Sequence, residues 1–375
     1  MRATLQLYGI RWGVDLPVNP PVLPMLAKRV DELPSAGAWI FEPKWDGFRA
    51  LVFRSGKDVL IQSRDQKPLN RYFPELIEPL RKQLPQKCVL DGEVVIAKGG
   101  ALDFDALQLR IHPAVSRVKM LSEQTPASVV FFDLLCRGER DLREEPFSRR
   151  RAELEKILAD AAQPLHITPA TDDPTQVHDW FGRFEGAGLD GVVAKQKDGT
   201  YVSDKRVMLK VKHERDCDCV VAGFRWYRKG DAEAVGSLLL GLFDDDGVLQ
   251  HVGVVGSFPM EKRKELVQFL APYRKNAAKN HPWRDAASES GDGDGTHRLP
   301  GGQSRWSQGK DLSWEPLRPE LVVEVAYEHM QSGRFRHMAQ FRRWRFDKKP
   351  AACTYEQLEV VPPQELSEIF PESRR

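Results

Sequence analysis

The sequence lacks three features that would place it in other classes of protein. It contains no run of about 20 apolar residues, so no membrane-spanning helix is expected, and no secretory signal is present. The five cysteines include no Cys-x-x-Cys pair, and Cys217-x-Cys219 has neither the spacing nor the partner pair of a common zinc site. We therefore expect reduced thiols in a cytoplasmic protein.

A large excess of charge of one sign is also missing. The 375 residues include 56 Lys and Arg against 54 Asp and Glu, which gives a formal net charge of +2. A nucleic-acid-binding surface would therefore depend on local clustering of basic side chains. The hydrophobic fraction of 41% is ordinary for a globular protein, and the length allows two domains.

The sequence does contain a lysine in an informative setting. The segment Lys44-x-Asp46-Gly47-x-Arg49 follows the apolar stretch 38–41. A lysine that is deprotonated through burial or nearby positive charge can attack the α-phosphate of a nucleoside triphosphate. The glycine would let the backbone approach a ligand, and the arginine would place a charged donor near phosphate oxygens. The alternative is a surface turn, since Lys, Asp and Gly are common in turns.

Five further segments follow this lysine in order. They are 63–65, 90–95, 129–135, 189–195 and 208–212. Because residues two apart share a face of a strand, Asp91 and Glu93 would point the same way, as would Lys210 and Lys212. Paired carboxylates suit Mg²⁺ or a ribose hydroxyl, and paired lysines can neutralise an α-phosphate. Each segment alone has an ordinary structural explanation, but their joint occurrence in this order favours function.

This ordered set resembles the motifs of the covalent nucleotidyltransferases, which include DNA ligases, RNA ligases and mRNA capping enzymes. The resemblance implies that Lys44 becomes adenylated, that Arg64 holds a 5′-phosphate, that Phe132 stacks on adenine and that Glu42 recognises the adenine edge. The implied nucleotide-binding residues are Glu42, Lys44, Arg49, Arg64, Glu93, Phe132, Lys195, Lys210 and Lys212.

One motif departs from the family pattern. Family members usually carry Glu where this chain has Asp190, which keeps the charge but reaches one methylene less far. Direct contact with a metal and contact through water both stay open for this residue. The implied metal ligands are Asp91, Glu93 and Asp190, with Mg²⁺ as the expected ion and Mn²⁺ as the alternative; Glu185 is a second carboxylate near the same loop.

The pattern of the chain changes near residue 213. Before it, strand-like runs such as 92–97 and 128–135 alternate with helical segments, which predicts an α+β domain with largely antiparallel sheets. After it, the expected short strands lie at 220–224, 237–243, 249–255 and 321–327. With a hairpin turn at 243–248 and a helix at 259–270, they fit a small Greek-key barrel of the OB type. The Gly-, Ser- and Asp-rich segment 286–304 is expected to be a surface loop.

The second part of the chain ends in one more motif. Arg345-Phe346-Asp347-Lys348 matches the family pattern Arg-x-Asp-Lys, and the resemblance implies that it acts on the pyrophosphate leaving group. A mobile basic module that closes over the β- and γ-phosphates can stabilise the developing charge. The alternative is a basic strand end on the surface. The catalytic residues implied in all are Lys44, Arg49, Arg64, Lys210, Lys212, Arg345, Asp347 and Lys348.

Segments 63–66 and 103–110 resemble DNA ligases more than capping enzymes, and most of the chain resembles the short bacterial ATP-dependent DNA ligases of the ligase C type. This implies an enzyme that uses ATP to seal 3′-OH/5′-phosphate nicks in duplex DNA through lysyl-AMP, with roles in DNA repair, replication and recombination. It also implies a nucleoid-associated monomer without a membrane anchor, with other bacterial repair proteins as partners. The alternatives are an RNA ligase, a capping-type guanylyltransferase, or a non-catalytic nucleic-acid-binding protein on a decayed ligase core.

The expected domain organisation has four parts. They are an extension at 1–13 that is non-native or disordered, an adenylation domain at 14–212, an OB-fold domain at 213–350 and a C-terminal tail at 351–375. In this interpretation Val14 is the natural start and the chain is a catalytic core alone.

Overall fold

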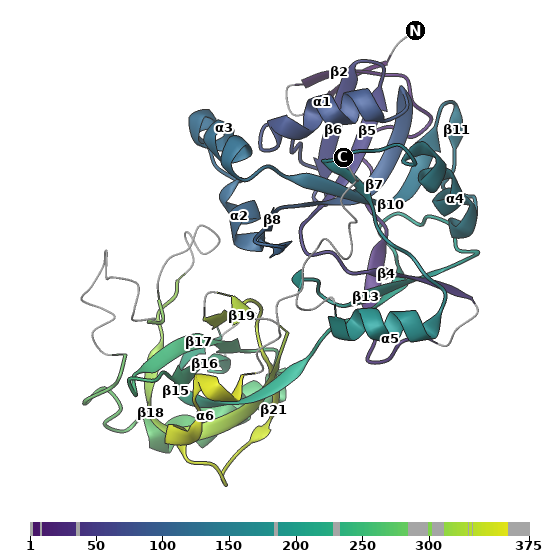
Figure 1. Ribbon diagram of the computed structural model, residues 1–375. Coiled ribbons are helices and arrows are strands. Elements are labelled where there is room, and N and C mark those ends of the chain that lie inside the picture. The colour runs from purple at the N-terminus through teal and green to yellow at the C-terminus, as the bar shows by residue number, and fades with distance from the viewer. Residues whose placement is uncertain are drawn as a thin grey trace. The chain divides into compact units, whose positions relative to one another are not determined.

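The structure is a computed structural model. It describes residues 3–7, 10–34, 38–183, 187–227, 233–283, 299–301, 311–328, 330–331 and 333–358. These residues form two compact units, one up to His213 and one from Glu214 onward (Figure 1). Every helix in the described parts is too short or too polar to span a lipid bilayer.

The larger sheet of the first unit has the strand order β11-β10-β7-β5-β6, with β12 added beside β10. Its strands are β5 (Phe48–Ser55), β6 (Asp58–Ser63), β7 (Lys87–Val95), β10 (Ser128–Arg137), β11 (Arg140–Asp141) and β12 (Leu165–Ile167). Neighbouring strands run antiparallel except β10 and β12, which are parallel. The sheet is therefore largely antiparallel, as the sequence predicted.

Both faces of this sheet are covered, which explains its continuous apolar runs. Along β5, Ala50 and Val52 belong to one hydrophobic cluster and Leu51 and Phe53 to another, as alternation along a strand requires. The first cluster also takes in apolar side chains of α1 (Pro74–Gln83) and α4 (Phe147–Ile157), which lie against the sheet in Figure 1.

The smaller sheet has the order β3-β14-β13-β4. Its strands are β3 (Leu26–Arg29), β4 (Trp39–Pro43), β13 (Val192–Gln196) and β14 (Arg206–Val211). Only β3 and β14 run parallel. The remaining helices of this unit are α2 (Phe104–Leu109), α3 (Val115–Gln124) and α5 (Pro174–Arg183), and β8 (Ala97–Lys98) pairs with β9 (Ala101–Leu102).

Two motif glycines allow neighbouring backbone segments to approach closely. A Cβ at Gly47 would lie 2.2 Å from the carbonyl oxygen of Val94. A Cβ at Gly191 would lie 2.1 Å from the carbonyl oxygen of Val211, and the φ of Gly191 is +126°. Any side chain at either position would push apart the strands that carry the neighbouring motif residues.

A buried ion pair ties α4 to β10. Arg150 donates from Nε to Asp133 Oδ1 at 2.8 Å and from Nη2 to Oδ2 at 3.0 Å, and both side chains are at most 1% exposed. Arg150 also donates to the backbone carbonyl groups of Glu145 and Gly199. Removing one partner of such a pair costs about 3–5 kcal/mol, because the other charge stays buried.

The second unit is a five-stranded antiparallel sheet with the order β17-β16-β15-β18-β21. Its strands are β15 (Arg215–Trp226), β16 (Val235–Phe243), β17 (Leu249–Val255), β18 (Glu315–Tyr327) and β21 (Gln340–Trp344), and its helix is α6 (Met260–Arg274). The two edges meet in a single bridge between Val255 and Ala339, so the described strands do not close a full barrel. The short hairpin β19 (Met330–Gln331) and β20 (Arg334–Phe335) completes the unit.

The predicted hairpin turn joins β16 to β17. Gly247 donates to the carbonyl oxygen of Asp244 at 3.0 Å and has a φ of +73°, while Asp244 Oδ1 accepts from the backbone of Asp246 and Val248. Most of the expected loop at 286–304 lies outside the described residues.

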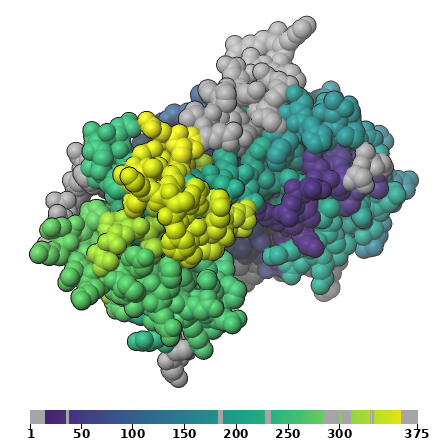
Figure 2. All heavy atoms as spheres, turned by 90° about the horizontal axis from the view of Figure 1, so that it is seen from below, coloured from purple at the N-terminus to yellow at the C-terminus, as the bar shows by residue number. Residues whose placement is uncertain are grey.

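β1 (Ala3–Leu7) and β2 (Ile10–Val14) pair as an antiparallel hairpin, and they take in most of the segment expected to be a non-native or disordered extension. Residues 350–352 and 355–357 form short 3₁₀ helices, and Cys353 is fully buried in the core of the second unit. The yellow atoms of this last described stretch pack beside the green atoms of the same unit in Figure 2. Residues 351–358, expected to belong to a C-terminal tail, thus pack on the core of the second unit through Cys353, Tyr355 and Leu358.

Candidate active site

A pocket of about 460 Å³ in the first unit is lined by both sheets. The predicted residues among its lining are Glu42, Lys44, Arg49, Arg64, Glu93, Phe132, Lys195 and Lys210. Segments that are far apart in the sequence therefore meet around one cavity that can hold a nucleotide.

Lys44 follows β4 and is held by the motif that precedes β13. Its backbone N–H donates to Gly191 at 2.8 Å, and its carbonyl accepts from Asp190 at 2.9 Å. Its Nζ lies 2.6 Å from Asp190 Oδ2, and Nζ of Lys212 lies 3.0 Å from the same oxygen. Burial alone would raise the pKa of Asp190, but the charges of Lys44 and Lys212 outweigh it and hold that pKa below its usual range.

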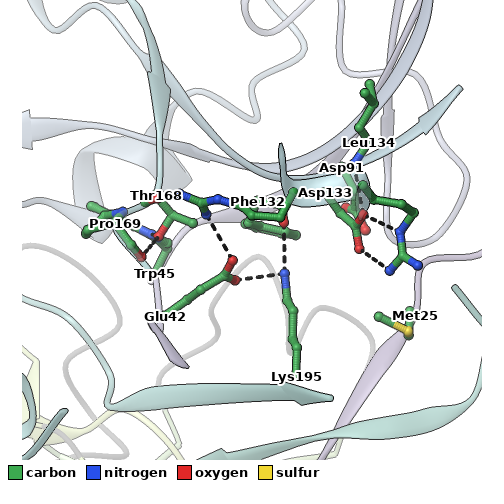
Figure 3. A network of polar contacts seen from close by, with 12 residues as sticks. Met25, Glu42, Trp45, Asp91, Phe132, Asp133, Leu134, Thr168, Pro169 and Lys195 are labelled. Carbon is green, nitrogen blue, oxygen red and sulfur yellow. Dashed lines mark hydrogen bonds and ion pairs between the residues drawn. The ribbon is translucent and has the colours of Figure 1, made fainter. Parts of the chain in front are cut away.

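Glu42 lines the pocket and is buried, at 2% exposure. Lys195 Nζ lies 2.7 Å from Glu42 Oε2, and Arg151 Nη1 lies 3.2 Å from Oε1. Lys195 also donates to the carbonyl of Phe132 at 3.0 Å, and Figure 3 shows Glu42 and Lys195 pointing toward one another beside Phe132. Arg151 in turn donates to the carbonyl of Thr168 at 2.7 Å, which fixes the carboxylate in place.

Arg49 is locked by Asp91 and also lies against the ring of Phe132. Arg49 donates from Nε and Nη2 to the two oxygens of Asp91, each at 2.6 Å, and its Cζ lies 4.6 Å from the ring centroid of Phe132. The hydroxyl of Tyr201 donates to Asp91 Oδ2 at 2.6 Å and accepts from Met25 N at 3.0 Å. Both carboxylate oxygens of the fully buried Asp91 are therefore engaged, and this arrangement does not favour its predicted metal role.

Glu93 faces the pocket. Of the three predicted metal ligands, it is the one whose position best suits that role. Burial raises the pKa of Glu93 to about 7, although Arg49 and Lys44 act in the opposite direction. In the described residues no group of three or more His, Cys, Asp or Glu side chains could hold a metal by itself. Glu185, the second carboxylate considered, lies outside the described residues.

Further cations line the same pocket. Arg64 is exposed, and Lys210 stands opposite Arg29 in the register of β14 with β3. Arg29 and Arg206 also line the cavity, and the sequence alone did not single them out. A triphosphate is the kind of ligand that suits this concentration of positive charge.

The last motif lies in the second unit, at the end of β21. Arg345 Nη2 lies 2.8 Å from Asp347 Oδ2, and Lys348 Nζ lies 2.9 Å from Asp218 Oδ2. Hydrogen bonds from Arg345 hold the pKa of Asp347 at about 2. Phe346 between them is 74% exposed. The arginine and the lysine are both paired with acids of their own unit.

Family models match both units. The model described as the ATP dependent DNA ligase domain matches residues 24–212, and the one described as the ATP dependent DNA ligase C terminal region matches residues 231–348. The chain belongs to the ATP-dependent DNA ligases. The ligase is 54% identical to DNA ligase C2 of Mycolicibacterium smegmatis over 93% of this chain and 97% of that protein. It is 52% identical to DNA ligase C of Mycobacterium tuberculosis over 96% and 99% of the two chains.

Among solved structures, a Lig E DNA ligase matches with a TM-score of 0.52 at 15% identity, covering 86% of this ligase and all of that chain. At that identity the likeness concerns the fold alone. The predicted fold class, an adenylation domain followed by an OB-type domain, is confirmed, as is the short bacterial ligase type.

Sequence reasoning missed the residues that hold the motif side chains in place. Arg151 lies in the run Arg149-Arg150-Arg151, which looks like the solvated face of a helix, and Tyr201 carried no motif signal. Both become visible only when α4 and the loop before β14 are packed against the sheets.

Proposed function

We propose that Lys44 is the nucleophile of this ATP-dependent DNA ligase and that it carries AMP between ATP and a DNA nick. The observation that supports this most is the Lys44–Asp190–Lys212 cluster beside the cavity. In the first step a bond forms between Lys44 Nζ and the α-phosphorus, and the bond to the β-phosphate oxygen breaks to release pyrophosphate.

Lys44 attacks only as the neutral amine, so a proton must leave Nζ first. Asp190 accepts a hydrogen bond from Nζ, but the two lysines hold the pKa of Asp190 low, so the carboxylate is a weak base. We therefore propose that Asp190 orients the amine of Lys44 and does not act as the base that removes its proton. Lys212 and Lys210 would then neutralise charge on the α-phosphate.

The adenine is placed by the inner end of the pocket. Phe132 offers a ring for stacking, and Glu42 offers a carboxylate that can accept from the amino group of adenine. A guanine oxygen at that position would face the same carboxylate and be repelled. Lys195 and Arg151 hold Glu42 in one orientation, which supports a preference for ATP over GTP.

The donor set fits Mg²⁺ only in company with the nucleotide. Mg²⁺ is commonly bound by one or two carboxylates together with substrate phosphates, and Glu93 supplies one carboxylate at the pocket. A bound Mg²⁺ would supply charge neutralisation at the phosphates. Glu93 would hold it, with Asp190 as the second candidate through water.

The later steps would use Arg64 and Arg49. Arg64 is exposed at the pocket and can hold the 5′-phosphate of a nick, where AMP from Lys44 is transferred. The 3′-hydroxyl then attacks that phosphate and AMP leaves. DNA contacts of this kind read phosphates and nick shape, so binding should weaken with salt and show no sequence preference.

The direct test compares four reactions of the purified ligase. Lysine labelling is measured with α-labelled ATP and with α-labelled GTP, and sealing is measured on a nick with a 3′-deoxyribonucleotide and on one with a 3′-ribonucleotide. We expect labelling by ATP alone and sealing of the DNA nick. Labelling by GTP would favour the capping-type alternative, and sealing confined to the ribonucleotide nick would favour an RNA ligase.

A role in DNA repair, a monomeric state, a nucleoid location and partner repair proteins belong to the same proposal. They are supported by the resemblance to ligase C and stay predictions.

A further inference from the structure

One acid in the second unit holds both cations of the last motif. Asp218 lies in β15, and its two oxygens each accept from Arg345 Nη1 at 3.1 Å. Its Oδ2 also accepts from Lys348 Nζ at 2.9 Å. The residue is 7% exposed, so this double contact is mostly shielded from water. Asp218 belongs to none of the sequence motifs.

Asp218 is itself fixed by a residue beyond the expected end of the OB domain. The side-chain amide of Gln357 accepts from the backbone N–H of Asp218 and donates to its carbonyl, both at 2.9 Å. β15 pairs with β16 only from Val220 onward, while β18 covers the other edge of Asp218. Gln357 therefore takes the place of a neighbouring strand at this point.

The segment that carries Gln357 is anchored to the same unit. Phe243 of β16 donates to the carbonyl of Cys353 at 2.8 Å, and Cys353 is fully buried. Gln357 also donates to the carbonyl of Thr354 at 2.9 Å. The geometry is thus a chain of contacts from the buried Cys353, through Gln357 and Asp218, to the exposed motif.

We propose that Asp218, held by Gln357, is a positioning residue that sets Arg345 and Lys348 in the geometry that lysine adenylation requires. This rests on the proposed role of those two cations in pyrophosphate departure. Arg and Lys side chains have many rotamers, and fixing them before the substrate binds lowers the entropy cost of a charge-stabilising contact. A reaction slows strongly when such groups are misplaced by about 1 Å.

The test replaces the acid by its neutral isostere, Asp218→Asn. Single-turnover formation of lysyl-AMP is measured against ATP concentration, the reverse reaction is driven with pyrophosphate, and sealing is measured on a nick that already carries AMP. We expect adenylation and its pyrophosphate-driven reversal to fall about 10- to 100-fold, with sealing of the pre-adenylated nick unchanged.

The matched control is Asp216→Asn. Asp216 is an exposed acid two residues earlier on the same face of β15, and it lies 3.4 Å from Arg342 instead of the motif cations. This variant should behave like the parent in all three assays. Gln357→Ala provides a second route, since it leaves the charge of Asp218 intact; it should slow adenylation by a smaller factor and spare pre-adenylated sealing.

The comparison with Arg345→Ala separates this inference from the proposed function. If Asp218 acts through Arg345 and Lys348, adding Asp218→Asn to a variant that carries both Arg345→Ala and Lys348→Ala causes no further loss of adenylation. An unimpaired Arg345→Ala variant would refute the role of the motif itself. A defective Arg345→Ala variant beside a normal or faster Asp218→Asn variant would overturn the positioning role only, and so would equal loss of pre-adenylated sealing by Asp218→Asn.

Discussion

The two units of this ligase pair their functional cations in different ways. In the first unit, Glu42, Asp91 and Asp190 are buried acids, each bound to a lysine or arginine at the pocket. In the second unit, Arg345 and Asp347 meet on the surface, with side chains 21% and 69% exposed. A buried pair resists separation because each charge would stay desolvated, whereas an exposed pair exchanges partners at little cost.

This difference matches the tasks proposed for the two regions. A nucleotide pocket gains from side chains that keep one orientation before and after binding. In a module that acts on a leaving group, the ion pairs between its cations and its own acids must break when phosphate binds and form again afterwards. Asp218 is the exception, because it is a shielded acid to which the cations of the exposed motif are anchored.

The largest effect is expected at the proposed nucleophile, Lys44. Lys44→Ala should abolish labelling by α-labelled ATP, and Lys44→Arg should fail as well because a guanidinium does not deprotonate near neutral pH. The fold should survive, because the backbone bonds of Lys44 to Gly191 and Asp190 do not need its side chain. Circular dichroism checks the fold, and Lys57→Ala, which alters an exposed lysine, is the control variant. Formation of an adenylate on the Lys44→Ala protein would contradict the assignment of Lys44 as the nucleophile.

The next effect separates the units by reaction step. Arg345→Ala should slow lysyl-AMP formation by about 100-fold or more but spare sealing of a pre-adenylated nick, since no pyrophosphate leaves in that step. Arg64→Ala in the first unit should damage sealing of the pre-adenylated nick as well as ATP-dependent sealing, because the proposed role of Arg64 is to hold the 5′-phosphate of the nick in each. If Arg345→Ala lost pre-adenylated sealing as badly as ATP-dependent sealing, the arginine would be a DNA contact or a structural residue.

A smaller effect tests how the pocket uses its acid. Asp190→Asn should slow adenylation by about tenfold or more, because one charge that pairs with Lys44 and Lys212 is lost. Asp190→Glu should preserve activity if the acid contacts a metal directly, and should reduce it if the short reach to Lys44 matters more. Single-turnover labelling distinguishes these results, and parent-like activity of both variants would show that Asp190 has no catalytic part.

The smallest effect is a pH dependence centred on Glu93. Burial raises the pKa of Glu93 to about 7, so the carboxylate becomes protonated as the pH falls through that value, and it would then lose the metal affinity proposed for it. Adenylation should therefore decline by a few-fold below about pH 7, and a higher Mg²⁺ concentration should move the inflection to lower pH. Glu93→Gln should be slow throughout and lack this Mg²⁺-dependent inflection. An inflection that ignores Mg²⁺ would assign the titration to another group.

The positions of strands and turns were predicted best where the local sequence alone sets them. The strand at 249–255 and the turn at 243–248 follow from local hydrophobic alternation and turn chemistry, and both are found as expected. The strand expected at 92–97 instead spans Lys87–Val95. Asp91-Gly92 has the local pattern of a turn, but a Cβ at Gly92 would lie 2.6 Å from the carbonyl of Val130, so the glycine marks close strand packing.

The sequence by itself indicated the ligase family and most of the charged side chains that line the pocket, because the motifs that carry them can be read from the order and spacing of residues along the chain. Only the tertiary structure decided how those side chains are held. Asp91 is engaged by Arg49 and Tyr201, Glu42 by Arg151, and Asp218 by Gln357. Partners 42 to 139 positions apart leave no mark on local composition. These pairings are set by which strands and helices pack together. A charged side chain that is buried in this way is stable only when it is paired with an opposite charge or a hydrogen-bonding group.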